Sequence, residues 1–121
     1  MATVLVVEDE FGIAELIEAV LEDEGYRVLI AVNGKHGLEM LAKERADLVF
    51  LDYMMPVMDG AAFLRGKAGD PSLRDIPTVV MSSLPEGTVA ERCVGYTIFL
   101  RKPFKVAEVI GITARLVGKP A

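Results

Sequence analysis

Four short apolar runs in this sequence end on side chains that can do chemistry. Each run is rich in valine, isoleucine or leucine, and the chain becomes polar immediately after it. The polar residues are Glu8, Asp9 and Glu10 after the first run, Asp52 after the second, Ser82 and Ser83 after the third, and Arg101 and Lys102 after the fourth. If the fold brings the ends of these runs together, carboxylates, a hydroxyl and an ammonium group form one site.

The acids of this set predict a metal site. Carboxylates held close together raise one another's pKa unless a cation neutralises them. Hard oxygen ligands of this type suit Mg²⁺, or alternatively Mn²⁺, and leave coordination positions for water and substrate oxygens. Lys102 suits an oxyanion such as phosphate, and carboxylates such as Asp52 can form aspartyl-phosphate intermediates. The residue types therefore indicate phosphoryl transfer to Asp52, with the metal and Lys102 balancing the charge.

The hydrophobic period of the chain predicts five strands that alternate with five helices. The strands are expected at residues 4–7, 27–31, 47–51, 78–81 and 98–100. The helices follow apolar stripes at Ile13, Leu16, Ile17, Val20 and Leu21; at Leu38, Leu41 and Ala42; at Ala61, Phe63 and Leu64; at Val89, Ala90 and Cys93; and at Val106, Val109, Ile110, Thr113 and Val117. Asn33-Gly34 is expected to form the turn before the second helix, and Asp59 to cap the third.

This alternation predicts the α/β class, with a doubly wound parallel sheet of five strands. Such sheets commonly have the strand order 2-1-3-4-5 in a flavodoxin-like, three-layer sandwich. Their ligands bind outside the carboxyl ends of the strands, at the switch point between strands 1 and 3. The polar residues that follow the four apolar runs would all lie at that edge.

Length and composition restrict the class of protein. The 121 residues suit a single domain, expected to span residues 1–121. The net charge of −5 argues against direct binding to nucleic acid or to anionic lipid. The single cysteine, Cys93, fits a reducing compartment, and the first residues carry no signal-peptide pattern. We therefore expect a soluble cytoplasmic protein that does not bind membranes.

The residues at the predicted edge carry a family resemblance. The segment Asp52–Gly60 has the pattern Asp-x-x-Met-Pro-x-Met-Asp-Gly, and Lys102-Pro103-Phe104 follows later. With the acidic pair Glu8-Asp9 and with Ser82, this sequence resembles the receiver domain of two-component response regulators over essentially its whole length. The resemblance implies a phosphoacceptor switch rather than an enzyme with a separate substrate. Such a domain would catalyse only its own phosphorylation and dephosphorylation.

The resemblance assigns a role to each matching residue. Asp52 would be phosphorylated, Ser82 would hydrogen-bond the phosphoryl group, and Lys102 would form an ion pair with it. Asp9 and Asp52 would bind Mg²⁺ directly, the Met54 backbone carbonyl would complete the protein ligands, and Glu8 would act largely through a coordinated water. Phe99 occupies the aromatic switch position. The Lys102–Pro103 peptide bond would be cis.

The resemblance also implies partners. A histidine kinase or a histidine phosphotransfer protein would supply the phosphoryl group. A downstream protein, which the sequence does not identify, would recognise the face made by helix 4, strand 5 and helix 5. We expect no output domain in this chain, because it stops soon after the last predicted helix.

Several residues depart from the family pattern. Ser83 stands where alanine is common, Gly95-Tyr96 replaces the usual Gly-Ala pair, and Phe99 lacks the hydroxyl of the commoner tyrosine. The segment between Ser82 and Lys102 is slightly short, so helix 4 is expected to be truncated or irregular. These differences affect the output surface rather than the phosphorylation chemistry.

Three other functions fit the sequence less well. An FMN-binding flavodoxin-like protein needs a phosphate loop after strand 1, where this chain has acids. A haloacid-dehalogenase-type phosphatase needs Asp-x-Asp there, but the sequence has Asp9-Glu10-Phe11. A receiver-like module that is never phosphorylated usually lacks a pocket residue, and this chain retains them all. Taken singly, the acids could also be helix-start residues, Ser82 a helix cap, and Lys102-Pro103 a simple turn.

Overall fold

Five parallel strands form one sheet in the order β2-β1-β3-β4-β5, as predicted. The computed structural model describes residues 1–119, and within this part five strands alternate with five helices. The elements are β1 (Thr3–Val7), α1 (Phe11–Asp23), β2 (Arg27–Ala31), α2 (Gly34–Lys43), β3 (Leu48–Asp52), α3 (Gly60–Ala68), β4 (Thr78–Ser82), α4 (Glu86–Ala90), β5 (Ile98–Arg101) and α5 (Val106–Val117).

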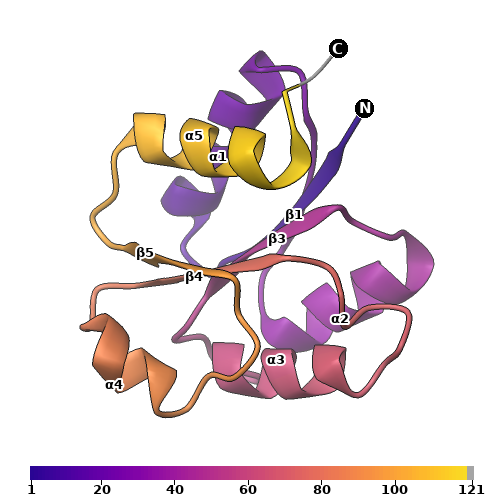
Figure 1. Cartoon of the computed structure of the whole chain (residues 1–121), viewed down its shortest axis with the longest axis vertical. Coiled ribbons are helices and arrows are strands. Elements are labelled where there is room, and N and C mark those ends of the chain that lie inside the picture. Colours follow the sequence, from indigo (N-terminus) through magenta and orange to yellow (C-terminus); the bar gives the residue numbers. More distant parts are fainter. Residues whose placement is uncertain (120–121) are drawn as a thin grey trace.

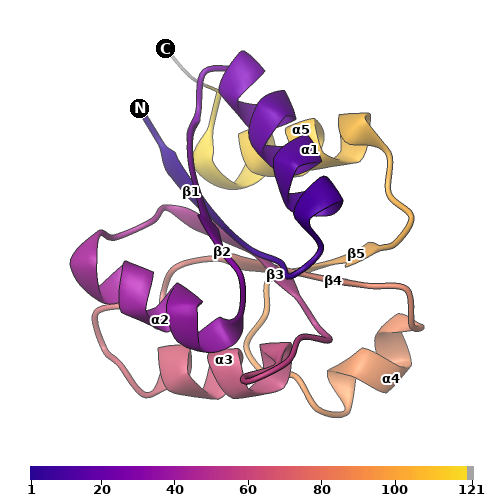
Figure 2. The same cartoon turned by 180° about the vertical axis from the view of Figure 1, so that it is seen from behind.

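Helices cover both faces of the sheet, which makes three layers (Figure 1). Helices α1 and α5 lie on one face, and α2, α3 and α4 lie on the other, as the view from behind also shows (Figure 2). The central strands β1, β3 and β4 are therefore buried along their whole length. Strands covered on both faces need apolar residues at successive positions, which explains their continuous runs of valine and leucine.

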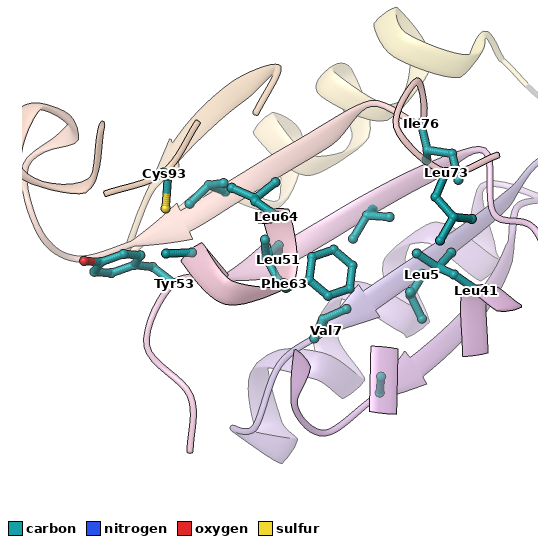
Figure 3. Packing of buried hydrophobic residues seen from close by; sticks show 14 of the residues in the cluster. Leu5, Val7, Leu41, Leu51, Tyr53, Phe63, Leu64, Leu73, Ile76 and Cys93 are labelled. Carbon is teal, nitrogen blue, oxygen red and sulfur yellow. The ribbon is translucent and has the colours of Figure 1, made fainter. Parts of the chain in front are cut away.

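The core consists of two clusters, one on each side of the sheet. On the side of α2, α3 and α4, Phe63 is fully buried and lies beside Val7 of β1 (Figure 3). On the side of α1 and α5, the largest fully buried side chain is Phe50. Burying one large apolar side chain contributes about 1.5–3 kcal/mol, so both clusters stabilise the sheet that positions the strand ends.

Four positions of the predicted apolar helix stripes are exposed: Leu16, Ala42, Ala90 and Val106. Leu16 is 44% exposed, because the buried face of α1 is centred on Ala14, Ile17 and Leu21. One residue corresponds to a rotation of about 100° around a helix axis, which places Leu16 at the edge of that face. Ala42 is exposed for the same reason beside the buried Leu41. Val106, at the start of α5, is 41% exposed. The other residues of the predicted stripes in α1, α2 and α5 are buried or half-buried.

Helix α4 has only five residues, as the short segment before β5 predicted. Its first residue, Glu86, accepts a hydrogen bond from the Tyr96 hydroxyl at 2.9 Å. This contact ties the helix to the loop before β5. None of the helices described for residues 1–119 has the length and apolar character needed to cross a membrane.

Candidate functional site

The carboxyl ends of β1, β3, β4 and β5 meet at one edge of the sheet. The register pairs Asp52 with Met81 and Ser82 with Arg101, so the polar ends of neighbouring strands lie side by side. Asp52 is the last residue of β3, one position further along the strand than expected. Polar residues that lie almost a hundred positions apart in the sequence, from Glu8 to Lys102, are therefore close together at this edge.

Lys102 joins two of the acids. Its Nζ lies 2.8 Å from Glu8 Oε1 and 3.1 Å from Asp52 Oδ1. Glu8 is 1% exposed and Asp52 is 6% exposed, so a single ammonium group contacts two carboxyl groups that water barely reaches. The other oxygen of Glu8, Oε2, accepts a hydrogen bond from the backbone N–H of Glu10 at 3.2 Å.

This crowding changes the acidity of the site. Burial and, after it, the nearby Glu8 carboxyl together raise the pKa of Asp52 from its ordinary 3.8 to about 8, although the Lys102 ammonium group lowers it. Burial also lowers the pKa of Lys102, but the Glu8 and Asp52 carboxylates outweigh burial and leave that pKa above its ordinary value. The metal-free pocket therefore keeps a charged lysine and resists ionisation of Asp52.

The acids fit a divalent cation. Glu8, Asp9 and Asp52 each offer a carboxylate oxygen, and these oxygens lie within 4.8 Å of one another. Asp9 is exposed, unlike its two partners, and opens the cluster to solvent. Closely spaced hard oxygens, one of them on the solvent side, are the donor set that Mg²⁺ accepts together with water.

A cavity of about 330 Å³ lies above these acids. Its lining residues are Asp9, Glu10, Ile13, Asp52, Met54, Ser82, Ser83 and Lys102. Ser82 Oγ accepts a hydrogen bond from the Leu84 N–H at 3.0 Å, so the hydroxyl proton stays available for another acceptor. Ser82 does not cap α4, whose cap position is Pro85. The cavity has room and donors for a phosphoryl-sized anion beside Asp52.

Six of the seven predicted site residues thus come together: Glu8, Asp9, Asp52, Met54, Ser82 and Lys102. Phe99 does not line this cavity. It is half-buried on the α4 side of the sheet, in the cluster to which Leu84 and Tyr96 also belong. The Lys102–Pro103 peptide bond is cis, as the family resemblance implied.

A second, more apolar cavity of about 440 Å³ adjoins the first. Its lining residues are Tyr53, Met54, Met55, Pro56, Asp59, Leu84 and Arg92. Met54 belongs to both cavities and is 66% exposed. Met54 therefore borders the space beside Asp52, and Leu84 lines the adjoining apolar cavity.

Sequence reasoning missed the close backbone packing behind the site. A Cβ at Gly60 would lie 2.9 Å from the carbonyl oxygen of Asp52, so a side chain there would press on the strand end. Gly34 at the start of α2 approaches Met58 just as closely. The sequence showed Asn33-Gly34 as a turn and Asp59, the residue before Gly60, as a cap, but the neighbours of the two glycines depend on tertiary contacts.

Known proteins are similar to this chain in sequence. The family model described as the response regulator receiver domain matches residues 4–114. The transcriptional activator protein PfeR of Pseudomonas aeruginosa is 36% identical over 119 residues, which are 95% of this chain and 37% of PfeR. Sporulation initiation phosphotransferase F of Bacillus subtilis is 35% identical over 109 residues, which cover 88% of this chain and 86% of that protein.

A solved structure extends the comparison to three dimensions. The receiver domain of sensor histidine kinase PA1611 from Pseudomonas aeruginosa superposes with a TM-score of 0.89. The two chains are 30% identical, and the match covers 98% of each. That structure has a magnesium ion coordinated in its active-site cleft.

Proposed function

Since this chain belongs to the family of response regulator receiver domains of two-component systems, we propose that Asp52 is its phosphoacceptor. The observation that carries the proposal is the Lys102 ammonium group bonded to both Glu8 and Asp52 beneath a polar cavity. Receiver domains interact with histidine kinases, and a kinase or a histidine phosphotransfer protein is the proposed donor. Residues 1–121 are proposed to act as one such domain in the cytoplasm.

The proposed reaction is a displacement at phosphorus. A carboxylate oxygen of Asp52 forms the new O–P bond while the N–P bond of the donor phosphohistidine breaks, and the electron pair returns to the imidazole. Asp52 must be ionised to attack, so a positive charge near it lowers the barrier. Lys102 supplies one such charge, and the Ser82 hydroxyl can donate a hydrogen bond to a phosphoryl oxygen. The domain thereby catalyses its own phosphorylation.

A divalent cation, Mg²⁺ with Mn²⁺ as the alternative, is the proposed cofactor. Asp9 and Asp52 would hold it directly, together with the backbone carbonyl of Met54, and Glu8 would act through a coordinated water. When bound, the cation neutralises the excess negative charge of the acids and of the incoming phosphoryl oxygens. Magnesium in the cleft of the PA1611 receiver domain supports this choice.

Phosphorylation is proposed to be read on the face of α4, β5 and α5. Phe99 is the proposed switch residue, and its ring packs in the cluster that includes Leu84 and Tyr96. Because Phe99 has no hydroxyl, its movement would depend on packing alone. The downstream partner would be a protein that prefers the phosphorylated form.

Labelling by a small phosphodonor tests the phosphoacceptor. With Mg²⁺ and acetyl phosphate, the intact protein should gain one phosphoryl group that hydroxylamine removes. Asp52→Asn should abolish this gain, whereas Asp23→Asn, an exposed acid at the end of α1, should leave it unchanged. Equal labelling of Asp52→Asn and the wild type would place the acceptor elsewhere. A folded wild type that is never labelled would favour an interaction module that works without phosphorylation.

A further inference from the structure

The loop between β3 and α3, residues 53–59, is held at its tip by the start of α2. The backbone N–H of Gly34 donates a hydrogen bond to the Met58 carbonyl at 3.1 Å. Asn33 fixes the direction of that N–H, because its side chain caps α2 by accepting from the His36 N–H at 2.8 Å. The first turn of α2 thus contacts the loop that contains Met54.

The contact leaves no room for a side chain at position 34. A Cβ built on Gly34 would lie 2.7 Å from the Met58 carbonyl oxygen and 2.9 Å from Met58 Cγ. The Cγ could turn away, but the carbonyl oxygen belongs to the backbone. A methyl group at this position must therefore move either α2 or the loop.

Helix α2 cannot move away easily, because two further glycine contacts hold it. A Cβ at Gly37 would lie 3.0 Å from both Phe63 and Val7, so α2 is packed directly on β1 and α3. Figure 3 shows these two side chains in the middle of the core. Gly66 of α3 packs against Leu38 of α2, with a built Cβ 2.7 Å from it. The loop is the part that must yield.

The loop is short and closed at its base, so a push at its tip is transmitted along it. The Gly60 N–H donates to the Tyr53 carbonyl at 2.9 Å, which closes the base. At the tip, the Met58 N–H donates to the Pro56 carbonyl at 2.8 Å, which makes a γ-turn centred on Val57 with φ of 70°. A β-branched residue at positive φ costs about 1–3 kcal/mol, and the contact with Gly34 opposes relaxation of this turn.

We propose that Gly34 is a positioning residue for the metal site. Its lack of a side chain and its N–H bond to the Met58 carbonyl would hold the loop in the position from which the Met54 carbonyl can bind the cation. The inference rests on the proposed function, because it takes Met54 as a metal ligand. Gly34 itself touches neither the acids nor the cavity.

Metal affinity tests this role directly. Mn²⁺ binding to the unphosphorylated protein can be followed by the electron paramagnetic resonance signal of free Mn²⁺. Gly34→Ala should raise the dissociation constant about tenfold, in the range typical of changes behind a metal's ligands. The matched control is Gly111→Ala in α5, where a new Cβ meets nothing within 4 Å. That variant should bind Mn²⁺ like the wild type.

Stability measurements separate positioning from general damage. Helix propensity alone would stabilise both alanine variants, so the thermal midpoint in EDTA shows whether Gly34→Ala remains folded. If it does not, the comparison moves to the Val57→Gly background, in which the loop tip can adjust without backbone strain. There, Gly34→Ala/Val57→Gly should fold and still bind Mn²⁺ more weakly than Val57→Gly alone.

Each outcome has one meaning. Weaker Mn²⁺ binding in a folded Gly34 variant, with Gly111→Ala unchanged, supports the proposal. Equal affinity of a folded Gly34 variant and its parent overturns it, because the loop would then tolerate the methyl group. A folded wild type that binds no Mn²⁺ at all would instead refute the metal site of the proposed function.

Discussion

Asp52 limits the stability of the metal-free fold through the cost of its own ionisation. Burial first, and then the Glu8 carboxyl, raise its pKa from 3.8 to about 8. Between these two values the folded protein keeps a proton that the unfolded chain has released. The free energy of unfolding therefore falls as the pH rises through this window, and the loss is complete above it. Asp52→Asn cannot ionise and avoids this loss.

The size of the stability difference between Asp52→Asn and the wild type follows from the change in the Asp52 pKa and from the access of solvent to the site. A carboxyl pKa raised from 3.8 to about 8 corresponds to a ceiling of roughly 6 kcal/mol. Solvent in the adjoining cavity and the Lys102 ammonium, 3.1 Å from Asp52 Oδ1, both reduce this cost. We expect Asp52→Asn to exceed the wild type in free energy of unfolding by about 1–3 kcal/mol near pH 8, and by much less near pH 5.

Urea denaturation followed by circular dichroism measures this difference. The wild type, Asp52→Asn and Asp23→Asn are compared in EDTA at constant ionic strength, at several pH values within the window. Addition of Mg²⁺ at high pH should then stabilise the wild type more than Asp52→Asn, because binding to the folded state alone adds to its stability.

Parallel pH profiles of the wild type and Asp52→Asn would refute the reasoning. They would show that Lys102 accommodates the ionised carboxylate without cost, so that Asp52 is an ordinary acid. Asp23→Asn should follow the wild-type profile in either case, because that variant retains Asp52.

The remaining predictions concern the metal, the lifetime of the phosphorylated form and the buried acid. Asp9→Asn should weaken Mg²⁺ binding, measured by titration calorimetry, and unchanged affinity would show that Asp9 is not a ligand. The double variant Met54→Asn/Leu84→Glu should lose its phosphoryl group about tenfold faster after donor removal, because polar groups can orient the attacking water. This change corresponds to a barrier lower by roughly 1.4 kcal/mol. Equal decay rates would mean that water access is controlled elsewhere. Glu8→Gln should lower the pKa of Asp52 by removing a neighbouring carboxyl, which a narrower pH window of stability loss would reveal.

Much of the fold follows from features that a sequence displays directly. The runs of valine and leucine predicted the strands because a parallel sheet is buried on both faces. Once the strands were known, the carboxyl edge of the sheet predicted that Glu8, Asp52 and Lys102 would meet. Asp59 caps α3 as expected, its side chain accepting from the Ala62 N–H at 2.9 Å.

The rest depends on distances that no periodicity encodes. Leu16 fits an apolar stripe, yet it is exposed because the sheet touches only a narrow sector of α1. Gly34 looked like a turn residue, although its role comes from a backbone that approaches it from another part of the chain. The pKa of Asp52 likewise depends on burial and on Glu8, which lies 44 positions earlier in the sequence.

An excess of negative charge links the stability of the fold to its proposed switching. A phosphoryl group on Asp52 would bring more negative charge, about −2 in total, and would draw both Lys102 and the Ser82 hydroxyl toward its oxygens. Ser82 Oγ is bonded to the Leu84 N–H, so movement of Ser82 pulls the segment that leads into α4. Helix α4 has only five residues and is tied down by the bond between Tyr96 and Glu86. So short a helix owes its stability to such contacts, and it is therefore the element that a new bond at Asp52 can shift at least cost.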